Sequence, residues 1–600
     1  MPARLLAAAV VAMLAAAAPA WAAGDPIMPL AQVQPGMQCT GYSVFQGTDI
    51  GSFDVTVLDV VDGDPSEDGP RILIRVSGPA VDATGVGPGF SGSPIYCKDA
   101  AGAARNIGAI SESVGEFGGK VALATPIETI LGTPVDPPQP RAGPARSGGA
   151  RAGTARARVS AARDRAWLAS ARPIATPLTV SGLTGPLSRA LVDAGHRVGR
   201  TVFAAPVGPL GSYPPQTLRP GSSVGVGYSS GDLRLGAIGT VAYVDGDRLW
   251  AFGHSLDGVG ARALLLEDAY VFHIVNNPNV SADETTYKLA SLGHDLGTLS
   301  NDTDDAVAGR VGAPTHTVPV KVIAQDGDTG ARRVVDVNVA DESAVDLPLG
   351  SSPLTQIAPL AVAQALSSLL ASQPARQTAT MCARITLAEI KRPLRFCNRY
   401  VSNALSEGDD GSLANAVTSG AGGDLLEALS DVDAYNGRPP HVTGVTARVV
   451  VSRGAHQAFL QRIRAPRRVR AGHTARVRLT LQEVRGSTIE RSYRIRIPAG
   501  LHRGRHALRL TGRDVDGGDD SFATTIIIGD IGSDFGSRGP RSLSALADEV
   551  RGISRYDGVT LHIGGDRRQA FRDVDLRISG AARTTVRVVS PRSDRRHRAR

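Results

Sequence analysis

The chain has 600 residues, of which 42% are hydrophobic and 20% charged, so it is long enough for several packed domains and is not disordered throughout. Its formal net charge of +8 lies mainly in residues 141–165, with seven arginines and one aspartate, and in the last ten residues, with five arginines and one aspartate. We therefore expect a nearly neutral folded part and no nucleic-acid partner. The simpler interpretation of the two basic stretches is that their arginines are solvated. The alternative is that both stretches associate weakly with anionic surface polymers or lipid.

Residues 1–22 have the features of a secretory signal peptide. Arg4 precedes an apolar run from Leu5 to Ala18, and Ala20-Trp21-Ala22 is a small-x-small cleavage signal. The run is short and rich in alanine for a membrane span, although an uncleaved anchor is the alternative, and no later stretch has the ~20 continuous apolar residues of a span. We expect a protein that is secreted or held at the cell surface.

Residues 23–133 contain short apolar or alternating stretches, such as 53–61, 71–76 and 106–110, separated by Gly, Asp and Pro. Strands this short and this closely spaced predict a small β-barrel or sandwich. The composition then changes to Ala, Arg, Gly and Pro over residues 134–172, which predicts a linker.

Residues 173–345 form a second β-rich region. An Asp245-Gly246 turn joins the strand 238–244 to a strand that ends at His254, which predicts a hairpin. Residues 346–435 mix helical stretches with a strand-turn-strand segment that carries two cysteines.

Regular alternation returns in the last third of the chain. Residues 436–516 predict an immunoglobulin-like sandwich, because polar and apolar residues alternate along several segments. Residues 517–588 predict a small α/β region with one helix at 542–553, and residues 589–600 form a basic tail.

Export makes disulfides the expected state of the four cysteines. Four cysteines allow three connectivities, and we predict Cys39 with Cys97 and Cys382 with Cys397, since each pair falls in one predicted region. Neither pair forms a C-x-x-C motif, so we expect no metal and no cofactor.

Two short motifs indicate a serine peptidase. Gly89-Phe90-Ser91-Gly92-Ser93-Pro94-Ile95 places a hydroxyl in a glycine-flanked turn, and Leu249-Trp250-Ala251-Phe252-Gly253-His254 ends an apolar run with an imidazole. A serine hydroxyl is a weak nucleophile until an adjacent base takes its proton. The N–H groups of Gly89 and Ser91 are then candidates for the oxyanion hole, and Ser93 for a hydrogen-bonding turn residue.

The serine motif, followed by Ile107-Gly108-Ala109 and by Ala124-Thr125-Pro126-Ile127-Glu128, resembles the SpoIVB-type serine peptidases of the chymotrypsin-like clan. Ile238-Gly239-Thr240 through Ala251-Phe252-Gly253-His254 is similar to the histidine-bearing segment of that family. The resemblance covers under half of the chain. It implies two chymotrypsin-like β-barrels with Ser91 as nucleophile and His254 as general base, within a mainly β protein that continues into sandwich-like and small α/β regions.

The order of the two segments departs from the family, where the histidine segment comes first, so here the site must be assembled across two barrels. The position of the family's acid falls on Ser77, with Asp82 nearby but shifted. We prefer Asp302, 48 residues after His254, as the third catalytic residue. The sequence therefore predicts an exported endopeptidase that acts on proteins or peptides; the alternative is a catalytically inactive binding or scaffold protein of the same descent.

Overall fold

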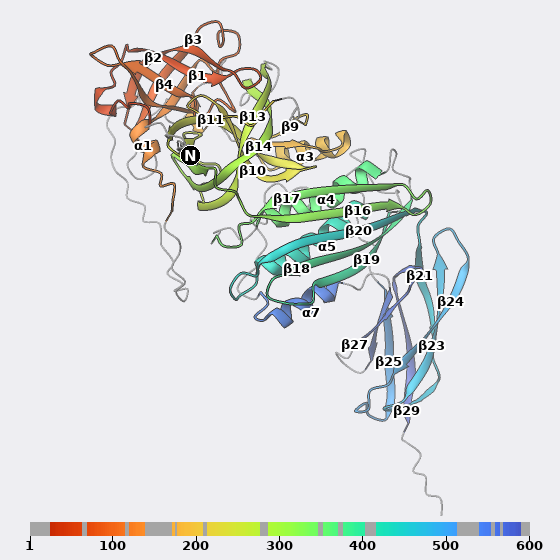
Figure 1. Ribbon diagram of the computed structural model, residues 1–600. Helices are drawn as coiled ribbons and strands as arrows, with labels where there is room; N and C mark the ends of the chain where they lie inside the picture. Colours follow the sequence, from red (N-terminus) through yellow and green to blue (C-terminus); the bar gives the residue numbers. More distant parts are fainter. Residues whose placement is uncertain are drawn as a thin grey trace, which may run out of the picture.

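The computed structural model of the protein is mainly β, and its parts follow one another from the first barrel to a terminal sandwich (Figure 1). No helix among the residues described is both long and apolar enough to cross a membrane. The predicted signal peptide, most of the predicted linker and the basic tail from residue 590 lie outside the described residues. The structure describes residues 24–62, 69–114, 119–137, 171–173, 177–207, 213–276, 286–345, 352–369, 376–402, 416–512, 539–553, 558–563 and 568–589.

Six strands of the first sheet pair in a closed ring. Side chains alternate along them, so that Phe53, Val55 and Val57 of the second strand are buried while Asp54 between them is exposed. A short edge strand, β7 (Ala171–Pro173), pairs with β5, and the short helix α1 (Ile127–Leu131) follows β6. The ring runs in the order β1 (Gln38–Val44), β2 (Ile50–Val61), β3 (Arg71–Ser77), β6 (Val121–Pro126), β5 (Ala104–Val114), β4 (Pro94–Lys98) and back to β1.

Six strands of the second sheet also pair in a ring. The predicted hairpin is confirmed, because Asp245 pairs with Arg248 across the turn. Two strands, β8 (Leu178–Ser181) and β9 (Val202–Ala204), extend the sheet beyond β11, and helix α3 (Gly185–Arg197) lies between them in the sequence. The ring runs in the order β10 (Ser223–Gly231), β13 (Gly260–Asn276), β14 (Thr286–Thr303), β15 (Ala306–Val311), β12 (Arg248–Ala251), β11 (Arg234–Asp245) and back to β10.

The same sheet continues into an α/β part, and the bounds of this part differ from the domain boundaries that the sequence predicted. The strands at 317–340, expected in the histidine-bearing region, pair with one another and with the strand at 442–453, expected in the sandwich. Helix α4 (Pro353–Leu369) packs on these strands, and helix α5 (Ala416–Asp433) packs on α4 and on the strands at 377–402, in one apolar core. Alternation shows which face of a strand is buried, but it does not identify the sheet that the strand joins. The strand order is β17 (Arg332–Ala340), β16 (Thr317–Asp326), β20 (Val442–Arg453), β18 (Gln377–Leu387) and β19 (Leu394–Ser402).

Both predicted disulfides are present. Cys39 and Cys97 lie opposite each other on β1 and β4, with Cα atoms 4.3 Å apart. Cys382 and Cys397 lie opposite each other on β18 and β19, with Cα atoms 4.1 Å apart. Each bridge therefore joins two neighbouring strands of one sheet.

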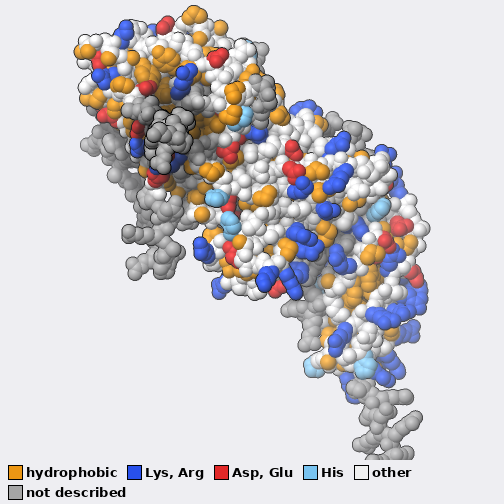
Figure 2. Space-filling model, viewed as in Figure 1, with side chains coloured by type: hydrophobic (Ala, Val, Ile, Leu, Met, Phe, Trp, Pro, Cys, Tyr) orange, Lys and Arg blue, Asp and Glu red, His pale blue; other side chains and the backbone are white. Residues whose placement is uncertain are grey.

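The last part is a β-sandwich with its own apolar core, and positively charged side chains gather on its surface (Figure 2, lower right). The strands from residue 558, expected in a separate small α/β region, complete this sandwich, because Val559, Leu561 and Ile578 are buried in its core. Helix α7 (Leu543–Ile553) packs instead on α5 and β19. One sheet has the order β24 (Thr488–Arg496), β23 (Thr474–Glu483), β21 (Gln457–Arg464), β28 (Arg577–Ser579), and the other β22 (Arg468–Arg470), β29 (Ala581–Val589), β25 (Gly504–Thr511), β26 (Gly558–Ile563), β27 (Arg568–Arg572).

The two barrels share buried apolar clusters. One cluster joins Phe90 and Ile95 of the first barrel to Ile238, Val271 and Leu292 of the second. A smaller cluster joins residues of β5, α1 and the segment after it to residues of β11, β12 and β15. The barrels are therefore packed together by core contacts, and the serine and histidine motifs lie in this contact region.

Candidate functional site

The serine turn, residues 88–93, leads into β4 and contacts the second barrel directly. Gly92 has φ of +88°, and a Cβ on it would lie 1.9 Å from the carbonyl oxygen of Thr240 and 2.6 Å from the amide nitrogen of Phe252. No side chain fits in that space. Glycine at position 92 therefore lets the second barrel approach the turn closely, and it also permits the positive φ of the turn.

The histidine turn, residues 252–254, follows β12 and is conformationally strained. Phe252 has φ of 68°, which is uncommon for a residue with a Cβ, and its ring is fully buried. The hydroxyl of Thr125 in the first barrel donates a hydrogen bond of 2.7 Å to the carbonyl of Gly253. Such strained positions persist where surrounding contacts fix them, and they are enriched at functional sites.

The backbones of two residues, Thr240 and Ile110, join the serine turn to the histidine turn. The amide of Thr240 donates to the carbonyl of Ser91 at 2.8 Å, while the carbonyl of Thr240 accepts from the amide of Phe252 at 3.2 Å. The carbonyl of Ile110 accepts from Gly92 at 2.7 Å and also lies 3.1 Å from the position of a Cβ on Gly253. The structure thus brings the two motifs of separate barrels into contact through their backbones.

The expected oxyanion donors have fixed directions. The N–H of Gly89 shares a peptide bond with the carbonyl of Pro88, which accepts from the amide of Lys288 at 2.9 Å. The N–H of Ser91 shares a peptide bond with the carbonyl of Phe90, which accepts from the amide of Ser93 at 2.9 Å. In a trans peptide the N–H points opposite to the C=O, so these bonds also set the directions of the Gly89 and Ser91 N–H groups. Within the described part of the chain these two N–H groups donate no hydrogen bond. Neither N–H is therefore committed to a partner among the described residues, although both residues are buried in this conformation.

Ser91 and His254 are both buried in this conformation. Ser91 is 2% exposed and His254 is 5% exposed. No hydrogen bond between the Ser91 hydroxyl and the His254 imidazole occurs among the contacts of the described residues. The structure therefore shows adjacent turns without an assembled nucleophile and base.

The imidazole of His254 is held as a neutral base. Its Nδ1 lies 2.7 Å from the carbonyl oxygen of Ser255, and because a carbonyl only accepts, Nδ1 carries the proton and Nε2 is the basic atom. Burial lowers the pKa of His254 to about 4, and the positive charge of Arg71 acts in the same direction. Arg71 forms an ion pair with Glu112 at 2.8 Å.

Asp302 lies close to the histidine turn but bonds to backbone. One carboxylate oxygen accepts from the amide of Leu256 at 2.7 Å, and the other accepts from the amides of Asp257 and Gly258 at 2.8 and 2.9 Å. Asp302 thus holds the loop that follows His254, while the carbonyl of Ser255 orients the imidazole. Asp82, the shifted alternative, is exposed and accepts from the amide of Gly78 at 3.0 Å.

Lys288 is a site residue that the sequence did not reveal. Its ammonium nitrogen is buried among hydroxyls, at 2.8 Å from Ser43, 3.0 Å from Thr240 and 3.3 Å from Ser223. The Ser93 hydroxyl lies 3.0 Å from that of Ser43. Burial lowers the pKa of Lys288 to about 7. A lone lysine in a strand gives no signal of this kind, because its partners come from segments far apart in the chain.

The Lys288 cluster supports the serine turn from behind. The Thr240 hydroxyl, which accepts from Lys288, donates to the carbonyl of Gly89 at 2.9 Å. The Lys288 ammonium also lies 4.8 Å from the centre of the Phe90 ring. The Ser43 hydroxyl is fully buried and also lies within hydrogen-bond distance of the hydroxyls of Ser93 and Thr240. We assign Lys288 to holding the turn, and Ser91 remains the candidate nucleophile.

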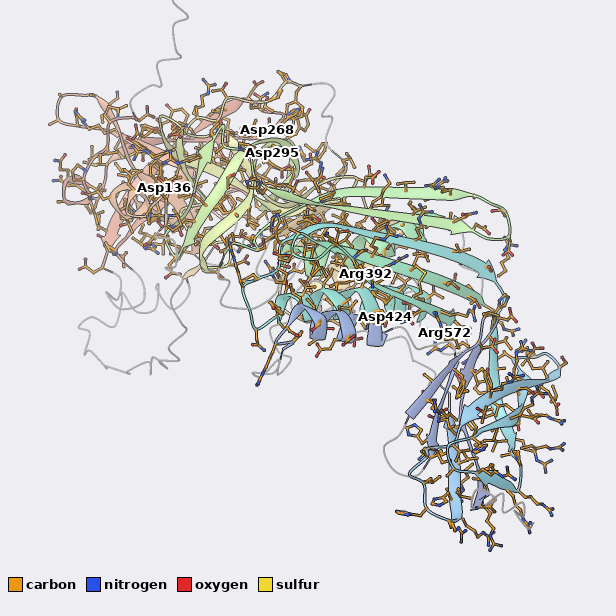
Figure 3. The ribbon with its side chains drawn as sticks, turned by 60° about the horizontal axis from the view of Figure 1, so that its bottom comes forward. Asp136, Asp268, Asp295, Arg392, Asp424 and Arg572 are labelled. Carbon is orange, nitrogen blue, oxygen red and sulfur yellow. A yellow bond between two sulfur atoms is a disulfide. The ribbon has the colours of Figure 1, made fainter. Side chains whose placement is uncertain are left out.

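A second polar group lies on β13 and β14, where Glu267 and Asp268 are buried and the exposed Asp295 is registered opposite Glu267 (Figure 3). Arg234 lies 3.1 Å from a carboxylate oxygen of Glu267, and burial raises the pKa of Glu267 to about 8. Asp268 accepts from the amide of His294 at 2.6 Å. In the portion of the chain that the structure describes, no group of three or more His, Cys, Asp or Glu side chains is arranged to hold a metal.

Comparison of the chain with protein-family models, with curated proteins and with solved structures gives no match in any of the three. The functional assignment therefore depends on the geometry of the two turns. That geometry supplies a hydroxyl, a neutral imidazole and two amide donors at one interface, which is the set of groups that acyl transfer requires.

Proposed function

We propose that the protein is an exported serine endopeptidase of chymotrypsin-like architecture, with one site built across the two barrels and with proteins or peptides as substrates. One observation carries the proposal: the turns that hold Ser91 and His254 are in direct contact through Thr240 and Ile110. The two turns come from different barrels, and they share these backbone partners in the buried contact between the barrels. Export is supported by the two disulfides.

In the proposed reaction the Ser91 hydroxyl oxygen attacks a peptide carbonyl carbon while His254 Nε2 takes the hydroxyl proton. The negative charge that develops on the carbonyl oxygen is stabilised by the N–H groups of Gly89 and Ser91. His254 then returns the proton to the leaving amine, and water releases the acyl group from Ser91 by the same steps in reverse order. No other group is needed to balance the proton transfers.

The burial of both side chains means that a substrate must separate the two turns before reaction. The strained backbone at Phe252 and the small residues of the serine turn are the places where such a movement can occur. The same burial favours a second candidate function, a catalytically inactive binding or scaffold protein that keeps the peptidase-like fold. The two candidates differ in whether Ser91 reacts.

A fluorophosphonate probe distinguishes them on the full exported chain. An active serine peptidase is labelled at Ser91, and labelling is lost in Ser91→Ala and strongly reduced in His254→Ala. Ser113→Ala, a change of a serine on β5 outside both turns, is the matched control and keeps full labelling. Absence of labelling in the folded wild-type protein favours the inactive candidate.

A further inference from the structure

One outer face of the sandwich carries a dense group of arginines. Along three neighbouring strands, exposed arginines alternate with buried apolar residues such as Val477, Leu479 and Ile495. The arginines therefore all point away from the core, on the same side of the sheet. The members of this group, called here the arginine face, are Arg462, Arg464, Arg476, Arg478, Arg494 and Arg496.

The strand register places like charges directly opposite each other. Arg464 pairs with Arg478 across β21 and β23, and Arg476 pairs with Arg494 across β23 and β24. Residues opposite each other in an antiparallel pair have Cβ atoms about 5 Å apart, and like charges there destabilise the sheet. Residues two apart on one strand are about 7 Å apart. The arginine face is thus a grid of positive charges that costs folding free energy.

The charge on this face is only slightly compensated, because Glu490, exposed on β24 opposite Thr480, is the one acidic residue that β21, β23 and β24 place on it. In the described residues none of its six arginines forms an ion pair. Elsewhere in the same chain arginines are matched with carboxylates, as in the pairs of Arg71 with Glu112, Arg234 with Glu267 and Arg262 with Glu342. A general excess of arginine in the sequence therefore does not explain the face.

The opposite outer face of the sandwich repeats the pattern. On its second sheet Arg468, Arg587 and Arg505 lie side by side across three strands, and Arg509 pairs with Arg583. All five are exposed. Residues 457–511 alone hold fourteen arginines against two glutamates, so the nearly neutral folded part that we expected is the sum of a basic sandwich and a more acidic remainder.

We propose that the sandwich binds a flexible, linear polyanion that bears phosphate groups and contacts both outer faces. Guanidinium groups pair with phosphate oxygens in a bidentate way, and closely spaced arginines that neutralise several phosphates release the counterions condensed on the polyanion. A planar lipid surface or a rigid duplex reaches only one of two opposite faces. Thr474, Thr480 and Ser492 lie directly beside the arginines, and the exposed Phe459 lies at the other end of β21, so among the described residues the arginines have no row of aromatic side chains beside them on which successive bases could stack.

The proposal is independent of the peptidase activity, and it is tested by direct binding. The full chain is titrated into fluorescently labelled long-chain inorganic polyphosphate, and anisotropy is recorded at several salt concentrations. The wild type binds with an affinity that falls steeply with salt. The variant R476Q/R478Q/R494Q on one face and the variant R505Q/R583Q/R587Q on the other each lose at least tenfold in affinity and have a weaker salt dependence.

The control removes the same number of charges outside the sandwich, in the variant R332Q/R333Q/R384Q, and keeps the wild-type affinity within about twofold. Folding is checked by thermal unfolding without ligand, where removal of like-charge pairs raises the midpoint. Equal losses in the control and in the sandwich variants would overturn the proposal. So would binding that disappears when residues 590–600 are deleted, or tighter binding to anionic vesicles or duplex DNA that depends on one face only.

Discussion

The amide of Thr240 in the second barrel donates a hydrogen bond of 2.8 Å to the carbonyl of Ser91 in the first. The same threonine accepts from Phe252 through its carbonyl and supports Gly89 through its hydroxyl. One residue of β11 thus contacts both the serine turn and the histidine turn, so the geometry of the proposed site depends on the packing between the barrels.

Replacement of Gly92 by alanine should break this packing. The added Cβ would lie 1.9 Å from the Thr240 carbonyl oxygen, so the barrels must move apart, and we expect a loss of about 3 kcal/mol or more in the free energy of unfolding. Gly102→Ala is the matched control, because Gly102 has φ of +83° but open space around it. It should lose only about 1 to 2 kcal/mol from backbone strain. Equal losses in urea unfolding would show that the interface tolerates the Cβ.

Lys288 should make stability depend on pH. Burial lowers its pKa from 10.5 to about 7, so between these values the unfolded chain binds more protons than the folded chain. The free energy of unfolding should therefore rise as pH increases from about 8 to about 10. Lys288→Met should remove this part of the slope in urea titrations. Lys321→Met, on the exposed face of β16, should keep it; an unchanged slope in Lys288→Met would contradict the assignment.

The reactivity of Ser91 should have an unusual pH profile. Because burial lowers the pKa of His254 to about 4, its imidazole stays neutral at pH values where an exposed histidine is already charged. Labelling by a fluorophosphonate should be nearly constant from about pH 5.5 to about pH 8 and should decrease only under more acidic conditions. A profile with a midpoint near the ordinary pKa of histidine would mean that the imidazole is exposed to solvent when the probe reacts.

Cleavage of the chain between the barrels should not separate them. Arginine-rich sequence between Arg141 and Arg165 is a preferred target for trypsin, so limited digestion should cut there first. The fragments should still elute together in size-exclusion chromatography and remain reactive at Ser91, because residues such as Ile95 and Val271 share one buried cluster. Fragments that separate while Ser91 keeps its full reactivity would exclude His254 as its base.

Features that depend on short-range pattern could be predicted from the sequence. The disulfide between Cys382 and Cys397 and the hairpin at Asp245-Gly246 each involve two strands joined by a short turn, so alternation and turn residues were sufficient. The boundaries of the larger parts were harder to predict from the sequence. Strand β20 pairs in parallel with β16, more than a hundred residues earlier, and no local signal reveals such a partner.

The candidate site was predicted in part. The glycines of the serine turn and the residues around His254 marked the two turns, and the structure brings these turns together. The sequence could not reveal Lys288, since its environment is formed by Ser43, Ser223 and Thr240 from distant strands. It also could not show that Asp302 bonds to backbone amides, because an acidic residue in a polar segment has the same appearance in either role.

Because the serine motif precedes the histidine motif in the chain, the serine motif is also synthesised first. During synthesis the first barrel emerges with Ser91, while Thr240, His254 and Lys288 are still to be made. At the usual elongation rates the last of these follows after roughly ten to forty seconds. Until then the turn around Ser91 has neither the amide that holds its carbonyl nor a histidine beside it. A growing chain of this design carries its proposed nucleophile in an unsupported form, and the proposed chemistry can begin only after the second barrel has folded onto the first.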